Sequence, residues 1–97
     1  MGYQVIFAPR AIQRLAETVR FIARENPDAA LQFGNRLIRQ AELLADYSEL
    51  GNPYAKRPGV RHLWCKPYFI YYRLQTRDRV VEIMDYWHSA RPEPVHP

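Results

Sequence analysis

The stretch "KPYFIYYRL", residues 66–74, decides the fold predicted for this chain of 97 residues. It places five consecutive large apolar side chains between Pro67 and Arg73. Aromatic and β-branched residues favour β-strands, in which successive side chains point to opposite faces of the sheet. The stretch therefore predicts a central strand with one face in the core. Whether its other face also packs, or binds a partner, stays open at this point.

Segments with alternating apolar residues lie on both sides of this strand. "VRHLWC" (60–65) precedes it across Lys66-Pro67, and "RVVEIMDYWH" (79–88) follows it after the turn "QTRD". Such alternation, bounded by turn residues, predicts strands. Consecutive strands joined by short turns pair antiparallel, so residues 60–88 predict a three-stranded meander.

Residues 3–50 predict a strand and two helices. "YQVIFA" (3–8) is a short strand-like run, and "ENPDAA" (25–30) separates two segments with helical periodicity. Asn26 suits the N-cap of the second helix and Pro27 its first turn. Because the connection is short, we expect an antiparallel hairpin. The predicted apolar faces are Ile12, Leu15, Ala16, Val19, Ile22 and Ala23 in the first helix and Ala30, Phe33, Leu37, Ala41, Leu44 and Ala45 in the second.

These elements predict an α+β fold with the helices packed on one face of the sheet. The order is an N-terminal strand, an antiparallel helix hairpin, and then a three-stranded antiparallel meander that completes one sheet. We expect a single domain over residues 1–91. The proline-rich tail, residues 92–97, should be irregular.

Charge is distributed unevenly along the chain, whose formal net charge is +4. Residues 1–50 contain six basic and six acidic side chains, which cancel. Residues 51–77 contain no Asp or Glu, and their basic residues are Lys56, Arg57, Arg61, Lys66, Arg73 and Arg77. Such a local excess attracts polyanions or acidic protein surfaces, although a solvated basic face without a dedicated partner would look the same.

The alternation within residues 68–74 assigns side chains to two faces. Tyr68, Ile70, Tyr72 and Leu74 should face the helices, whereas Phe69, Tyr71 and Arg73 point the other way. Arg61, Leu63 and Cys65 of the preceding strand, or their alternates, join this second set. An open face with Tyr71, Arg73 and Arg61 beside the Lys56/Arg57 loop would be a binding surface, unless the C-terminal tail covers it.

Several classes of function find no support in the sequence. The chain has a single cysteine, Cys65, which excludes an internal disulfide and fits a reducing compartment. We expect its side chain to pack in the core as a small apolar residue. His62, His88 and His96 lack metal-ligand spacing, and no cofactor motif is present. No apolar run approaches the ~18 residues that span a membrane, and no signal peptide is recognisable. We expect a cytoplasmic protein without metal, cofactor or membrane partner.

The chain resembles the ParE/RelE superfamily of bacterial type II toxins over residues 3–91. The resemblance is carried, in order, by "FAPRAIQRLAETVRFIAREN", "NPDAALQFGNRLI", "RPGVRHLWCKPYFIYYRL" and "VEIMDYWHSAR". The ending with His88, Ala90 and Arg91 is most similar to the ParE branch. The resemblance implies the fold predicted above and a toxin held inactive by a partner antitoxin, whose C-terminal segment binds as a helix and an added strand.

The two branches of the superfamily imply different targets. ParE-like members inhibit DNA gyrase, and here Trp87, His88, Arg91 and the basic loop at Lys56 and Arg57 would contact the target. RelE-like members cleave mRNA on the ribosome, and here Arg61, Arg73 and His88 would be the catalytic candidates. Ribonuclease members usually carry a basic residue where this chain has Phe69, and a functional Tyr where it has Ser89. These departures favour gyrase inhibition, with the endoribonuclease as the alternative.

Two further expectations concern partners. An acidic antitoxin should bind the basic face through Arg61 and Arg73, with apolar contacts supplying much of the affinity. A degenerate member that binds only its antitoxin, and regulates transcription with it, would cause no growth arrest. The sequence does not say whether this chain is active as a toxin.

Overall fold

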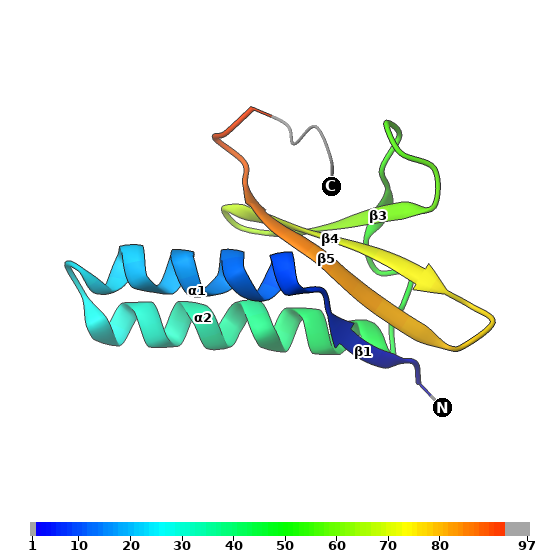
Figure 1. Cartoon of the computed structure of the whole chain (residues 1–97), viewed down its shortest axis with the longest axis horizontal. Coiled ribbons are helices and arrows are strands. Elements are labelled where there is room, and N and C mark those ends of the chain that lie inside the picture. The colour runs from blue at the N-terminus through cyan, green and yellow to red at the C-terminus, as the bar shows by residue number, and fades with distance from the viewer. Residues whose placement is uncertain (1, 93–97) are drawn as a thin grey trace.

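The computed structural model describes residues 2–92, so of the predicted tail only Pro92 lies within the described residues. The chain forms two helices and five strands, with a 3₁₀ turn after the second helix (Figure 1). The elements are β1 (Gln4–Phe7), α1 (Pro9–Ala23), α2 (Pro27–Glu42), the 3₁₀ turn η1 (Leu43–Ala45), β2 (Asn52–Pro53), β3 (Val60–Cys65), β4 (Tyr68–Gln75) and β5 (Val80–His88). The predicted α+β order is confirmed.

A proline opens each helix, and the second helix begins where the sequence predicts. Pro9 opens α1, and the side chain of Asn26 caps α2 by accepting a hydrogen bond from the backbone N–H of Ala29 at 3.0 Å. The two helices pack closely at Gly34, where an added Cβ would lie 2.9 Å from a methyl group of Val19. A larger residue there would push the hairpin apart.

The buried face of α1 differs from its predicted stripe. Ile12, predicted to be buried, is 56% exposed, whereas Ala11 and Thr18 are buried. The helix contacts both α2 and β5. Small side chains occupy its most buried positions because two elements approach it at once. The prediction for Ile12 was therefore wrong, and the preceding residue, Ala11, occupies the buried position.

The five strands form one sheet in the order β1-β5-β4-β3-β2. The predicted meander is confirmed, since β3, β4 and β5 pair antiparallel. The N-terminal strand β1 adds parallel to β5, and the two-residue strand β2 forms within the segment 48–59, which the sequence indicated only as a loop. In Figure 1 the helices lie on one face of the sheet, and the tip of their hairpin extends past it. Within residues 2–92, neither helix is long and apolar enough to cross a membrane.

The two faces of the sheet have separate apolar clusters. The helix-side cluster contains Ile70 and Tyr72 of β4, with Tyr68 and Leu74 packed against it, as predicted. Cys65 belongs to the same cluster and is buried, which confirms its predicted role in the core. The open-face cluster consists of Tyr54, Val60 and Tyr71, with Phe69, Met84 and Trp87 packed against it.

The strand register decides which residues of β3 join each face. Val60 lies opposite Arg73, and Trp64 lies opposite Phe69, so the even-numbered residues of β3 share the open face. Arg61 pairs with Tyr72 and belongs to the helix-side set. The sequence left open whether Arg61, Leu63 and Cys65 or their even-numbered neighbours lie on the open face. The even-numbered residues do, so Arg61 is not on that face.

Candidate functional site

Arg61 is occupied by the fold. Its Nε donates to the carbonyl oxygen of Gly51 at 3.1 Å, and its terminal nitrogen donates to that of Glu49 at 3.2 Å. The guanidinium thus closes the segment that leads from the helices into β2. Its donors are directed at backbone oxygen atoms of the same chain, so Arg61 contributes to local structure.

Arg73 lies on the open face, as predicted, but has an acidic partner. Its terminal nitrogen is 2.7 Å from a carboxylate oxygen of Glu82, the residue directly opposite on β5. Opposite charges in such cross-strand positions stabilise the pair of strands. Glu82 therefore neutralises one of the charges that the sequence assigned to a basic binding surface.

Tyr71 also lies on the open face, but it is only 2% exposed. The ring of Tyr54 packs against it edge-on, with 5.2 Å between the ring centroids. The loop that carries the nearby Lys56 and Arg57 therefore covers the aromatic residue that the sequence assigned to the surface. Lys56 itself is exposed, and Arg57 is half-buried.

The three catalytic candidates do not form a cluster. His88 lies opposite Tyr68 on β4, five residues from Arg73, which corresponds to about 17 Å along a strand. Tyr68 and Arg73 also point to opposite faces of the sheet. Arg61 is held at the β2 side of the sheet, two strands away from β5. A single phosphodiester bond could not contact all three side chains in this arrangement.

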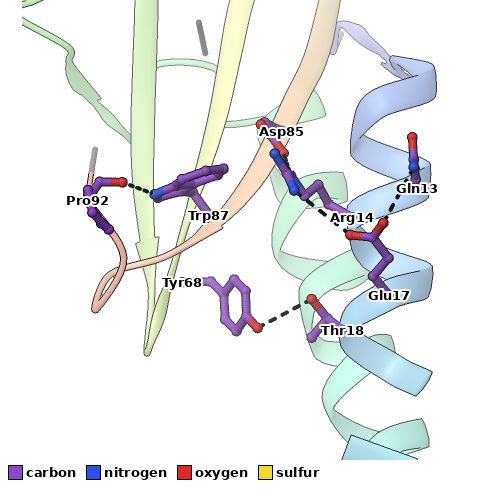
Figure 2. Close-up of polar contacts among 8 residues, drawn as sticks. All are labelled: Gln13, Arg14, Glu17, Thr18, Tyr68, Asp85, Trp87 and Pro92. Atoms are coloured by element: carbon purple, nitrogen blue, oxygen red, sulfur yellow. Dashed lines mark hydrogen bonds and ion pairs between the residues drawn. The ribbon is translucent and has the colours of Figure 1, made fainter. Parts of the chain in front are cut away.

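The end of β5 and the turn that follows it, residues 88–92, have a defined shape. The Nδ1 atom of His88 accepts a hydrogen bond from the backbone N–H of Ala90 at 3.0 Å. The indole N–H of Trp87 donates to the carbonyl oxygen of Pro92 at 2.8 Å (Figure 2). We call residues 88–92 the C-terminal turn.

A groove of about 580 Å³ lies between α1 and the end of the sheet at which the C-terminal turn begins. Its lining includes Arg14 and Arg20 from α1 and Arg24 at its C-cap, with Tyr68, His88 and Arg91 among the residues opposite. We call it the arginine groove. Phe21, which is 69% exposed, also lines it and lies 6.0 Å below the guanidinium of Arg24. The groove thus combines positive charge with exposed aromatic surface.

The arginine groove brings His88 and Arg91 together with residues that the sequence did not assign to a site. Arg14, Arg20 and Arg24 entered the sequence-based predictions only through the charge count over residues 1–50, in which basic and acidic side chains cancel. The available signal was the four-residue spacing of Arg20 and Arg24, which places two basic side chains side by side on a helix. What they face could be known only from the packing of α1 on β5.

Asp85 is fully buried beside this groove. Its Oδ1 atom accepts a hydrogen bond from Nε of Arg14 at 3.1 Å, an interaction visible in Figure 2. Burial raises the pKa of the Asp85 carboxyl, and the neighbouring Arg14 partly offsets that increase. The guanidinium of Arg14 also lies over the ring of Trp87, 4.7 Å from its centroid. Arg14 therefore links α1 to two residues of β5.

Two other buried titratable groups, Tyr86 and Cys65, keep their protons at neutral pH. Burial raises the pKa of the Tyr86 phenol, whose hydroxyl donates to the carbonyl oxygen of Leu37 at 3.2 Å. Burial also raises the pKa of the Cys65 thiol. Both groups stay protonated at neutral pH, which makes neither of them a nucleophile or a base. In the described part of the chain, no three His, Cys, Asp or Glu residues are grouped so that they could hold a metal ion.

Solved structures with the same fold come from toxin–antitoxin systems. The chromosomal ParDE system from P. aeruginosa matches with a TM-score of 0.78 and 19% identity, over 89% of this chain and 95% of that chain. The toxin–antitoxin complex RelBE2 from Mycobacterium tuberculosis matches with a TM-score of 0.61 and 21% identity, over 91% and 99% of the two chains. The isolated E. coli RelE toxin matches with a TM-score of 0.57 and 16% identity, over 94% and 88%. The TM-scores establish a shared fold, and at identities this low the matches establish the fold alone.

The sequence itself establishes the family. The family model described as "ParE toxin of type II toxin-antitoxin system, parDE" matches residues 5–92. A comparison with curated protein sequences gives no match. The chain belongs to the ParE toxin family and is a type II toxin of the ParE/RelE superfamily.

Proposed function

We propose that this toxin acts by binding DNA gyrase and inhibiting it, and that a cognate antitoxin neutralises it. The observation that carries the proposal is the arginine groove, which joins His88 and Arg91 of the C-terminal turn to Arg20 of α1 and Arg24 at its C-cap. An open, positively charged groove with an exposed aromatic residue is suited to contact with a macromolecule. The match to the ParE family supports gyrase as the target.

The positions of the sheet arginines support binding over cleavage. Arg61 donates to backbone oxygens, and Arg73 is paired with Glu82. Both arginines lie near one end of β4, and His88 lies beside the other end. Charge-stabilised cleavage of RNA requires cationic groups around one phosphate. The residues from which the endoribonuclease alternative was built are spread over the sheet, so the target contact moves to the C-terminal turn and α1.

The same proposal assigns the partners. The ParDE and RelBE2 matches are a toxin–antitoxin system and a toxin–antitoxin complex, which supports an antitoxin as the partner of this chain. Its net charge of +4 favours an acidic partner by increasing the rate of association. Because gyrase acts on chromosomal DNA, the proposal places the toxin in the cytoplasm.

Two assays on one preparation test the proposal. Purified gyrase is given relaxed plasmid and increasing amounts of toxin, and ribosomes programmed with mRNA receive the same amounts in parallel. Loss of supercoiling, or trapped cleaved plasmid, with intact mRNA is the expected result. Codon-spaced cuts in mRNA with unaffected gyrase would replace gyrase inhibition by ribonuclease activity. Absence of both effects, with antitoxin binding retained, would indicate a member that acts only through its antitoxin.

A further inference from the structure

We propose that Arg14 of α1 is a positioning residue that fixes the C-terminal turn in the orientation used to contact the target; this rests on the proposed function. Arg14 and Asp85 are 71 residues apart in the sequence. Its role comes entirely from the packing of α1 against β5. The chain of contacts runs from Asp85 through Arg14 and Trp87 to Arg91 and Pro92.

The first link is the ion pair between Arg14 and Asp85. The pairing of β4 with β5 shifts between Tyr71 and Tyr72, so that Tyr71 lies opposite Asp85 and Tyr72 lies opposite Ile83. The extra residue, Met84, forms a β-bulge, a feature that redirects nearby side chains. The Asp85 side chain is fully buried, and its Oδ2 atom has no hydrogen-bond partner among residues 2–92. Arg14 supplies the strong hydrogen bond that this carboxyl does form.

The second link is the contact between Arg14 and Trp87. The Arg14 guanidinium lies 4.7 Å from the centroid of the Trp87 ring, and the Arg91 guanidinium lies 4.9 Å from it. Cation–π contacts of this kind are strongest with tryptophan. Trp87 is therefore held by two guanidinium groups, one from α1 and one from the C-terminal turn.

The third link passes from Trp87 to the turn itself. The indole N–H of Trp87 donates to the carbonyl oxygen of Pro92 at 2.8 Å, as Figure 2 shows. Arg91 stacks on the same ring. The orientation of the Trp87 ring consequently sets where Arg91 and Pro92 lie relative to the groove.

The requirements of these contacts favour arginine over other residues. A buried ion pair can often be replaced by apolar residues without loss of stability, so stability alone does not call for one here. A guanidinium can donate from Nε to Asp85 while lying over Trp87, because its donors are in a plane and its faces stack on aromatic rings. A lysine ammonium is a point charge that cannot satisfy both contacts in this geometry.

Other contacts hold the end of the sheet without Arg14, so the two effects can be separated. The Thr18 hydroxyl donates to the Tyr68 hydroxyl at 3.3 Å, and the backbone N–H of Ser89 donates to the carbonyl oxygen of Pro67 at 2.8 Å. These contacts join α1 to β4 and the β5 end to the β3–β4 turn. Loss of Arg14 should thus release the Trp87 ring and leave the strand ends paired.

The test uses the indole N–H of Trp87 as a reporter. Trp64→Phe removes the other indole, since the chain has two tryptophans. In this background, Arg14→Met is compared with Arg39→Met, which removes an exposed arginine from α2. We expect Arg14→Met to shift the indole resonance and to increase its hydrogen-exchange rate about tenfold, as loss of one partly buried cation–π contact would. Arg39→Met should leave both unchanged. An unshifted resonance with unchanged exchange in folded Arg14→Met would overturn the proposal.

A second variant covers the case in which Arg14→Met fails to fold. Arg14→Lys keeps a positive charge near Asp85 but loses the planar contact with Trp87. We expect it to fold, to shift the indole resonance as Arg14→Met does, and not to restore slow exchange. A wild-type indole spectrum in Arg14→Lys would show that charge alone suffices, which contradicts a positioning role for the guanidinium.

The supercoiling assay then separates this inference from the proposed function. If the wild-type toxin inhibits gyrase, Arg14→Lys should require about tenfold more protein for the same inhibition, as expected for loss of one such contact. Unchanged potency would overturn the link between the turn and the target. If the wild-type toxin does not inhibit gyrase, the proposed function fails, while the indole spectrum still decides whether Arg14 positions the turn.

Discussion

The arginines of the sheet and the arginines of the groove differ in what surrounds them. Arg61 and Arg73 lie in strands and find acceptors within the chain, the first at backbone carbonyls and the second at Glu82. Arg20, Arg24 and Arg91 line the groove and form no ion pair within residues 2–92; Arg24 and Arg91 instead stack on aromatic rings. The two strand arginines that the sequence assigned to a binding surface are therefore compensated within the chain, whereas Arg20, Arg24 and Arg91 of the groove form no ion pair in the described residues.

The difference has a physical cause. A strand places its side chains against those of both neighbouring strands, so a charged residue there loses hydration and must be compensated nearby. An exposed helix face or a turn keeps its charges hydrated, and they need no internal partner. A run of basic residues thus indicates a binding surface only after its local partners are known.

The largest effect should come from reversing charge in the groove. Arg20→Glu combined with Arg24→Glu should weaken gyrase inhibition about a hundredfold, because close charge pairs at interfaces each contribute about 1.5 kcal/mol or more. The fold should be retained, since substitutions at exposed positions typically change stability by less than about 0.5 kcal/mol. Dose–response curves for supercoiling, with thermal unfolding measured in parallel, check both statements.

A matched control makes this result specific. Arg39→Glu combined with Arg77→Glu changes the net charge equally at exposed positions on α2 and in the β4–β5 turn. This variant should inhibit gyrase with near wild-type potency. Equal weakening by the two double variants would show that total charge matters and that the groove has no special part.

The next largest effect concerns Arg61 and should appear in stability. Arg61→Ala removes a charged donor from the carbonyls of Gly51 and Glu49, and we expect the free energy of unfolding to fall by about 1.5 kcal/mol. Arg77→Ala, an exposed substitution, is the comparison. Chemical denaturation of both variants measures the difference. If Arg61→Ala were as stable as Arg77→Ala but bound antitoxin poorly, Arg61 would belong to an interface after all.

Asp85 should give stability an unusual dependence on pH. Burial raises the pKa of its carboxyl, so the native state keeps the proton at pH values where the unfolded chain, with an ordinary carboxyl pKa of about 3.9, has lost it. The contribution of Asp85 to stability is then full below that value and is lost as pH rises through the native pKa. Relative to Asp85→Asn, the wild-type free energy of unfolding should decrease as pH rises and then level off. A relative increase with pH would mean that the ion pair with Arg14 outweighs burial.

The smallest effect should come from Arg73. Its side chain is 43% exposed, and its pair with Glu82 is accordingly screened by solvent. Arg73→Ala should lower the free energy of unfolding by at most about 1 kcal/mol, and a double-mutant cycle with Glu82→Ala should give a coupling of about 0.5 kcal/mol that falls in high salt. A coupling near zero would leave Arg73 available to a partner, as the sequence suggested.

Much of the fold could be predicted because it depends on local patterns. The N-cap at Asn26, the prolines that open both helices and the alternation in β3 to β5 act over a few residues. The prediction for Ile12 failed because helical periodicity defines an apolar arc but not which part of that arc meets two neighbours at once. The candidate site was predicted only in part, through Trp87, His88 and Arg91.

By itself, the sequence determined the order of the elements and the faces of β4, which are encoded by residues close together in the chain. It also determined the resemblance to ParE toxins, which is carried by four short segments in order. The tertiary structure decided the register that separates Arg61 from Arg73, the bulge that directs Asp85 toward Arg14, and the groove that α1 forms with the C-terminal turn. These features depend on residues far apart in the sequence. Their contacts are set by how the helices pack on the sheet, which no local pattern of side chains specifies.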